Sequence, residues 1–124
     1  MKILIAEDEP ISNLWLKTML TKWGYEVIST RNGDDAWEVL KGANPPEIAL
    51  LDWEMPKIKG IEVCEKAKKD PGTSGICIIL LSGKDREEDL RKCFAAGADA
   101  YLKKPLDNER LKAKVDAARQ TLEH

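Results

Sequence analysis

The sequence predicts a doubly wound α/β fold, in which helices cover both faces of a five-stranded parallel sheet. Short apolar runs alternate five times with segments of helical character along the 124 residues. The runs IALL at 48–51 and ICIILL at 76–81 are apolar throughout, as is typical of parallel strands buried on both faces. Parallel strands need crossover connections, which the intervening helices supply. The flavodoxin-like strand order 2-1-3-4-5 is therefore the expected topology.

Five runs too short for a helix are the expected strands, and the last of them is the weakest. Turn signals, among them Asn32-Gly33 and Asn44-Pro45-Pro46, separate them from the helices. The strands are expected at KILIA (2–6), YEVIS (25–29), EIALLD (47–52), ICIILL (76–81) and ADAYL (98–102).

The five expected helices lie between and after these strands and are bounded by proline and glycine signals. They are expected from Pro10 to a stop at Gly24, from Asp34 or Asp35 to near Gly42, and at 60–69, 85–96 and 107–122. Apolar residues recur at helical spacing in the first helix (Ile11, Leu14, Trp15, Met19, Leu20) and share one face of the last (Leu106, Leu111, Val115, Ala118, Leu122).

The composition is that of a soluble globular protein, with 43% hydrophobic residues, 34% charged residues and a net charge of −2. Basic residues form no block, so direct nucleic-acid binding is not expected. No apolar run approaches membrane-spanning length, and no signal peptide is recognisable. The three cysteines are odd in number and form no CxxC pair, which fits a reducing cytoplasm. We expect a cytoplasmic protein without membrane contact.

One domain is expected to fill residues 1–122. The ending Leu122-Glu123-His124 resembles a cloning scar that runs into a purification tag. Residues 123–124 are therefore expected to be a tag remnant, and the domain is expected to be either a whole protein or one cut from a longer chain.

Charged and polar side chains follow the strands where each strand ends. They are Glu7, Asp8 and Glu9 after the first strand, Asp52 at the end of the third, Ser82, Gly83 and Lys84 after the fourth, and Lys103, Lys104 and Pro105 after the fifth. Because strands one and three are central neighbours in the expected order, their carboxylates converge. Clustered carboxylates disfavour ionisation unless a cation is present. The cluster predicts a Mg²⁺ site, which Mn²⁺ would also fit.

These residue types together predict phosphoryl transfer. A carboxylate beside Mg²⁺ can attack phosphorus and form an aspartyl-phosphate, while Ser82 and Lys104 would contact phosphoryl oxygens. Taken singly, each residue has a plainer interpretation, because acids and serines after strands often cap helices and lysines usually face solvent. The joint occurrence favours the chemical interpretation.

Four segments give the chain a resemblance, over essentially its whole length, to the receiver domain of two-component response regulators. They are ILIAEDEP (3–10), LLDWEMPKIKG (50–60), IILLSGK (78–84) and GADAYLKKPL (97–106). The resemblance implies that Asp52 is the phosphoacceptor and that Ser82 and Lys104 assist it.

The resemblance also implies the ligands of the metal and the parts of a switch. Glu7, Asp8 and Asp52 would bind Mg²⁺ together with the backbone carbonyl of Glu54. Ser82 would be the switch hydroxyl and Tyr101 the switch aromatic residue.

Two positions depart from the family pattern. Glu7 stands where the family usually has Asp, and its extra methylene is expected to be tolerated if contact to the metal runs through water. The segment ADAY (98–101) stands where DNA-binding regulators commonly have ADDY, which weakens any transfer of their dimerisation scheme.

The implied function is a signalling module that accepts a phosphoryl group from a histidine kinase or phosphotransfer protein. Such a module is not an enzyme toward other substrates, because it catalyses only its own phosphorylation and dephosphorylation. A switch face formed by 85–96, 98–102 and the last helix would meet an output domain or a target protein.

Three other functions are compatible with parts of the pattern. A hydrolase of the haloacid dehalogenase type would also form an aspartyl-phosphate, but it typically has DxDxT where this chain has DWEMP, and it needs a cap insertion. A degenerate receiver would lack the complete acidic, hydroxyl and lysine set. A nucleotide-binding module would need a Gly-rich loop after the first strand.

Two further expectations concern local geometry. The Lys104-Pro105 bond is expected to be cis, because a tight bend would turn Lys104 back toward Asp52. Glu54 and Lys84 lie two residues beyond Asp52 and Ser82 and have opposite charges, so they are expected to pair across the path of attacking water and tune the phosphoryl lifetime. The alternative is two solvated side chains that never meet.

Overall fold

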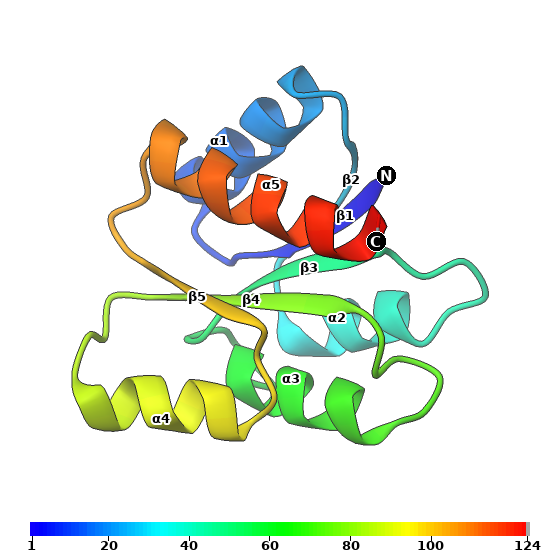
Figure 1. Ribbon diagram of the computed structural model, residues 1–124, viewed down its shortest axis with the longest axis vertical. Coiled ribbons are helices and arrows are strands. Elements are labelled where there is room, and N and C mark those ends of the chain that lie inside the picture. The colour runs from blue at the N-terminus through cyan, green and yellow to red at the C-terminus, as the bar shows by residue number, and fades with distance from the viewer. Residues whose placement is uncertain (124) are drawn as a thin grey trace.

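The computed structural model describes residues 1–123 and contains a five-stranded parallel sheet of order β2-β1-β3-β4-β5 (Figure 1). This order confirms the doubly wound prediction. The strands are β1 (Lys2–Ala6), β2 (Glu26–Thr30), β3 (Ile48–Asp52), β4 (Cys77–Ser82) and β5 (Ala100–Lys103). The helices are α1 (Pro10–Lys22), α2 (Gly33–Leu40), α3 (Gly60–Lys69), α4 (Glu87–Ala95) and α5 (Asn108–Glu123). Glu123 continues α5, whereas His124, the rest of the expected tag remnant, lies outside the described residues.

The helices form two layers on the sheet, with α1 and α5 on one face and α2, α3 and α4 on the other (Figure 1). The central strands are buried on both faces. Leu51 and Leu80 belong to the core under α2, α3 and α4, while Leu50 and Ile79 belong to the core under α1 and α5. This double burial explains why the β3 and β4 segments are apolar at consecutive positions.

The elements α4 and β5 each begin two residues later than expected. Ala98, the expected start of β5, donates its N–H to the carbonyl of Cys93 at 3.1 Å, so it still belongs to the turn that ends α4. Gly97 in that turn has a φ of 96°, which glycine adopts without steric cost. The strand therefore begins only at Ala100.

The face that α1 buries includes some, but not all, of the apolar residues at helical spacing. Ile11 and Leu14 are 78% and 65% exposed, whereas Leu16 and Leu20 are fully buried. Asn13 is buried with them. Trp15 and Met19 are partly buried against the same core, so the apolar spacing marks the buried face of α1 in part and fails at Ile11 and Leu14.

Asn13 points inward because its side chain bonds the ends of two strands. Its amide group donates to the backbone carbonyl of Glu7 at 2.9 Å and to that of Thr30 at 3.0 Å. Its amide oxygen accepts a hydrogen bond from the Ser29 hydroxyl at 2.6 Å. A buried polar group is retained where its hydrogen bonds are satisfied, and here they join α1 to β1 and β2.

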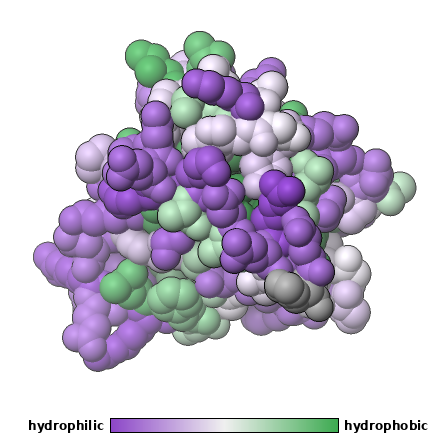
Figure 2. Space-filling model, turned by 45° about the horizontal axis from the view of Figure 1, so that its top comes forward, coloured by the Kyte–Doolittle hydropathy of each residue, from purple (hydrophilic) through white to green (hydrophobic). Residues whose placement is uncertain are grey.

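The face of the molecule in Figure 2 is mainly hydrophilic, and its hydrophobic groups form separate patches. On α5, Leu111, Val115 and Ala118 are buried as expected, and Leu106 is partly buried against the same core. Leu122 is exposed instead.

No helix within residues 1–123 is both long and apolar enough to cross a membrane.

The loop from β3 to α3 returns tightly onto the end of β3. Gly60, the first residue of α3, donates its N–H to the carbonyl of Trp53 at 3.0 Å. A Cβ atom on Gly60 would lie 2.1 Å from the carbonyl oxygen of Asp52. No side chain fits at that distance, so glycine at this position sets how closely the loop can approach β3.

We expect Gly60→Ala to lower the free energy of unfolding by about 1–3 kcal/mol, the usual cost of overpacking an interior, because the loop must move away from β3. Urea unfolding measures the change. Gly75→Ala is the matched control, since nothing lies within 4 Å of the position its Cβ would take. Equal stabilities of the two variants would contradict the close approach.

Candidate functional site

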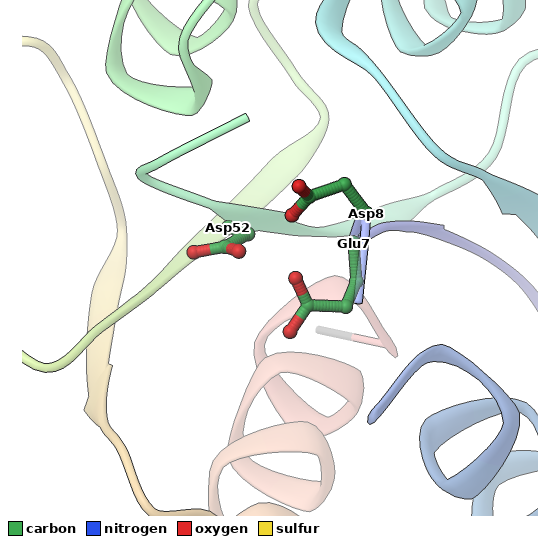
Figure 3. A group of neighbouring side chains, drawn as sticks. All are labelled: Glu7, Asp8 and Asp52. Atoms are coloured by element: carbon green, nitrogen blue, oxygen red, sulfur yellow. The ribbon is translucent and has the colours of Figure 1, made fainter. Parts of the chain in front are cut away.

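Three carboxylates meet at the carboxyl ends of β1 and β3, and Figure 3 shows them converging on a common space. Glu7 and Asp8 follow β1, and Asp52 closes β3. The two strands are paired in parallel, with Ala6 opposite Leu51. One carboxylate oxygen of each of the three residues lies within 4.8 Å of the others. The sheet therefore brings together the three acids that were expected to bind a metal.

The ammonium group of Lys104 contacts two of these carboxylates. Its Nζ donates to Glu7 Oε1 at 2.8 Å and lies 3.1 Å from Asp52 Oδ2. Its backbone N–H donates to the carbonyl of Ser82 at 2.8 Å, which joins the β5–α5 loop to the end of β4. The Lys104-Pro105 bond is cis, which confirms the expectation.

Burial and mutual repulsion shift the ionisation of this cluster. Asp52 is 5% exposed and Glu7 is 0% exposed. Burial, followed by the hydrogen bond and charge of Glu7, raises the pKa of Asp52 to about 7. Burial acts to raise the pKa of Glu7 as well, but its hydrogen bonds with Asp52 and Lys104 outweigh that effect and lower the pKa. Asp52 is thus the acid of this pair whose pKa is raised.

The cluster has the chemical character of a site for a hard divalent cation. Glu7 Oε2 is buried and has no hydrogen-bond partner within the described residues, although buried polar atoms are nearly always paired. The three acids offer oxygen ligands only, which Mg²⁺ prefers. A divalent cation would satisfy the orphaned oxygen and offset the repulsion between Glu7 and Asp52. The residues present therefore fit Mg²⁺.

Glu9, the third acid after β1, has a different role. Its carboxylate caps α1 by accepting hydrogen bonds from the backbone N–H groups of Ser12 at 2.7 Å and Ile11 at 3.1 Å. The bonds from Ser12 and Ile11 lower the pKa of Glu9. The plain helix-cap interpretation is correct for this residue.

Ser82 and Tyr101 lie together at the end of β4. Ser82 is buried beside the neighbouring strand end, where Asp52 pairs with Leu81. Its hydroxyl oxygen accepts a hydrogen bond from the N–H of Lys84 at 3.0 Å, an arrangement that leaves the hydroxyl proton able to donate elsewhere. Tyr101 is half-buried, and its hydroxyl donates to the carbonyl of Ser82 at 3.2 Å. The expected switch residues are therefore in contact.

Glu54 and Lys84 also meet. Lys84 Nζ lies 3.1 Å from Glu54 Oε1 and 4.7 Å from the centre of the Trp53 ring. The expected contact is confirmed, and the alternative of two side chains that never meet is wrong. The N–H of Glu54 donates to Asp52 Oδ1 at 3.3 Å. The role of the Glu54 carbonyl as a metal ligand stays a prediction.

Two residues that the sequence gave no reason to select shape the rim of the site. Arg31 donates to the backbone carbonyl of Asp8 from Nη2 at 2.9 Å and from Nε at 3.3 Å. Asn13 holds the carbonyl of Glu7. An arginine after a strand or an asparagine within a helix is usually solvated, so no sequence signal could have identified either contact.

The three free cysteines, Cys64, Cys77 and Cys93, belong to the core rather than to this site. Burial raises the pKa of Cys64 to about 12 and those of Cys77 and Cys93 to about 11. Such thiols stay protonated and are poor nucleophiles, so these cysteines act as core residues.

The chain matches the sequence profile of the family described as response regulator receiver domain over residues 3–116. It is 34% identical over 116 residues to the phosphate regulon transcriptional regulatory protein PhoB of Rhizobium meliloti, a match that covers 94% of this chain and 51% of PhoB. It is 35% identical over 116 residues to the protein PilH of Pseudomonas aeruginosa, a match that covers 94% of this chain and 95% of PilH. The chain thus spans about half the length of one relative and nearly all of the other.

A solved structure of a receiver domain has a fold similar to that of this chain. The signal receiver domain of a signal transduction histidine kinase from Syntrophus aciditrophicus matches this chain with a TM-score of 0.86 and 31% identity. The match covers 94% of this chain and 88% of that chain. The resemblance drawn from the four sequence segments is confirmed.

In metal-free buffer, stability should depend on pH through Asp52. The folded-state pKa of about 7 lies above the ordinary value of 3.8, so the folded state binds this proton more tightly than the unfolded state does. The resulting stabilisation is fully present below about pH 4 and is lost as the pH rises through about 7. Urea unfolding of the wild type and Asp52→Asn in EDTA measures it.

The Asn variant cannot ionise at this position. Its stability should therefore increase relative to the wild type as the pH rises through this range, and the difference should level off above it. A difference between the two proteins that does not change with pH would show that the Asp52 pKa is not raised.

Proposed function

This chain belongs to the response regulator receiver domain family of two-component systems, and we propose that it accepts a phosphoryl group on Asp52. One observation carries the proposal, namely the position of Asp52 at the end of a central strand. There it lies in a cluster with Glu7 and Asp8, with oxygens within 4.8 Å of one another, and 3.1 Å from the ammonium of Lys104. Phosphoryl transfer needs a nucleophile, metal ligands and a cation for the transferred oxygens, and these residues offer all three.

Asp52 would react as a carboxylate nucleophile. The bond from one of its oxygens to phosphorus forms while the bond from phosphorus to the imidazole nitrogen of a phosphohistidine donor breaks, and that nitrogen keeps the electron pair. Glu7, Asp8, Asp52 and the Glu54 carbonyl would hold Mg²⁺ or Mn²⁺, which would supply positive charge to the phosphoryl oxygens.

Lys104 and Ser82 would hold the phosphorylated product. Lys104 Nζ already contacts Asp52 Oδ2 and can shift to a phosphoryl oxygen on the same residue. The Ser82 hydroxyl can donate to a second phosphoryl oxygen. Since both the nucleophile and the product belong to the protein, the domain catalyses only its own phosphorylation and dephosphorylation. It works as a signalling module.

The proposed switch face consists of α4, β5 and α5. A Ser82 hydroxyl drawn toward the phosphoryl group would move away from the N–H of Lys84, and Tyr101, bonded to the Ser82 carbonyl, would turn further inward. Among the residues of α4, Cys93 is the one that is fully buried, so this helix is lightly anchored. A lightly anchored element can be biased between two states by phosphate contacts.

A histidine kinase or phosphotransfer protein would supply the phosphoryl group, and an output domain or target protein would read the switch face. The relatives offer both arrangements, because the match fills 95% of PilH but 51% of PhoB, a transcriptional regulatory protein. The cytoplasmic location and the domain boundary at residue 122 stay predictions.

The hydrolase alternative is not favoured. The matching family and the structural neighbour are receiver domains. In addition, the connections between β3 and α3 and between β4 and α4 are too short to form a cap.

We further propose that Glu54 and Lys84 tune the lifetime of the aspartyl-phosphate. Water must attack in line, opposite the Asp52 oxygen. The ion pair joins the loops that follow β3 and β4, and Lys84 also lies over the Trp53 ring. Because the pair is largely exposed, its contribution to stability is small, and its effect would come from obstructing the path of the water.

Asp52→Asn should abolish labelling by acetyl phosphate in the presence of Mg²⁺, because it removes the nucleophile while leaving a side chain of the same shape. Mass spectrometry of the intact protein measures the added phosphoryl group. Asp34→Asn, at an exposed acid on α2, is the control and should label like the wild type. Labelling of Asp52→Asn at the wild-type rate would refute the assignment.

Glu54→Ala and Lys84→Ala should each speed dephosphorylation by roughly two- to fivefold, the rate equivalent of losing a pair of ~0.4–1 kcal/mol. The double variant should be no faster than the quicker single variant, because either change opens the same path. Decay of the phosphorylated protein after donor removal, at fixed Mg²⁺, gives the rates. Lys59→Ala is the control. It removes a lysine that contacts the other Glu54 oxygen at 3.8 Å and leaves the pair of Glu54 and Lys84 intact, so it should not change the rate. Additive effects would leave the obstruction without support.

A further inference from the structure

We propose that Arg110 is a positioning residue that acts through Lys104. Arg110 lies in the first turn of α5, and its guanidinium group donates to two backbone carbonyls. Nη2 bonds the carbonyl of Lys103 at 2.5 Å, and Nη1 bonds that of Pro105 at 3.2 Å. These two carbonyls flank Lys104 on either side. One planar group therefore holds both ends of the short segment from which Lys104 projects.

The guanidinium group is itself held to a rigid element. Asp107 Oδ1 accepts the N–H of Arg110 at 2.8 Å, and Asp107 Oδ2 lies 3.4 Å from Nη1. The next residue, Leu111, is fully buried in the core between α5 and the sheet. The position of the Lys103–Pro105 segment is thereby tied to the packed helix α5.

This anchor bears on chemistry because of the way Lys104 reaches the acids. A lysine side chain has a flexible four-carbon stem, so the place of its ammonium depends on the place of its backbone. The Lys104 N–H bonds the Ser82 carbonyl, and its Nζ spans Glu7 Oε1 and Asp52 Oδ2. Without the Arg110 contacts, the segment would keep its attachment to β4, through the pairing of Lys103 with Ser82 and the Lys104 N–H bond, but it would lose its bonds to α5.

Arginine suits this task and lysine does not. The guanidinium has donors fixed in a planar fork that can reach two carbonyls at once, whereas an ammonium is a compact point charge. Arg110→Lys therefore keeps the charge and removes the double contact. Since Arg110 is exposed, water can replace its bonds to the two carbonyls when it is removed, and the fold should be little affected.

The rate measurement that tests this inference rests on the proposed function. A second readout, hydrogen exchange of the Lys104 amide, is independent of phosphorylation. Phosphorylation by acetyl phosphate with saturating Mg²⁺ should be roughly tenfold slower in Arg110→Ala and in Arg110→Lys, at the low end of what loss of a supporting contact costs at a functional centre. Thermal unfolding should be nearly unchanged. Arg119→Ala, at an exposed arginine of the same helix paired with Glu123, should behave like the wild type.

A double-variant test separates positioning from a general structural effect. In a Lys104→Ala background, Arg110→Ala should cause no further loss of rate, because the group through which it acts is gone. A further loss in that background, or wild-type rates in both Arg110 variants, would overturn the inference.

Hydrogen exchange of the Lys104 backbone amide gives the readout that needs no phosphorylation. This amide donates to the Ser82 carbonyl at 2.8 Å, and it should exchange faster in both Arg110 variants but not in Arg119→Ala. Unchanged exchange in the Arg110 variants would contradict the inference. Failure of the wild type to label, with the exchange result as expected, would count against the proposed function alone.

Discussion

The contact of one ammonium group with two buried carboxylates is the interaction on which this site depends. Parallel pairing of β1 and β3 ends both strands at the same edge, so Glu7 and Asp52 lie side by side. Burial and, after it, the contact with Glu7 raise the pKa of Asp52. Lys104 offsets part of the negative charge of these acids. Because Asp8 adds a third carboxylate, the cluster keeps an excess of negative charge. That excess suits a divalent cation and, through it, a phosphoryl group.

Backbone contacts around the acids keep this arrangement in place. Asn13 holds the end of β1, and the N–H of Gly60 holds the loop after β3 through its bond to the carbonyl of Trp53. Arg110 holds the segment after β5 that carries Lys104. Each contact uses a backbone carbonyl at the carboxyl edge of the sheet, so the site is supported from several elements at once. Such support is what a preorganised functional group requires.

The sequence was sufficient for the features that follow from local pattern. Runs that are apolar at consecutive positions identified β3 and β4, and the acids at strand ends located the cluster, because parallel strands all end at one edge of the sheet. The burial of Asn13 on α1 could not be predicted in this way, since it depends on hydrogen bonds from its side chain to backbone carbonyls at the ends of β1 and β2. The Arg110 contacts were likewise out of reach, because they depend on the shape of the loop after β5 rather than on residue spacing.

The central claim, that these acids hold a cation next to Asp52, is tested most directly by titrating metal-free protein with Mg²⁺ while following tryptophan emission. Trp53 adjoins Asp52 in the chain and is buried, while the other three tryptophans lie on or at the ends of α1 and α2. The expected result is a saturable change in the wild type that requires more Mg²⁺ in Asp8→Asn and disappears in Trp53→Phe. Emission that does not respond to Mg²⁺, or a response that Asp8→Asn leaves unaltered, would contradict the claim.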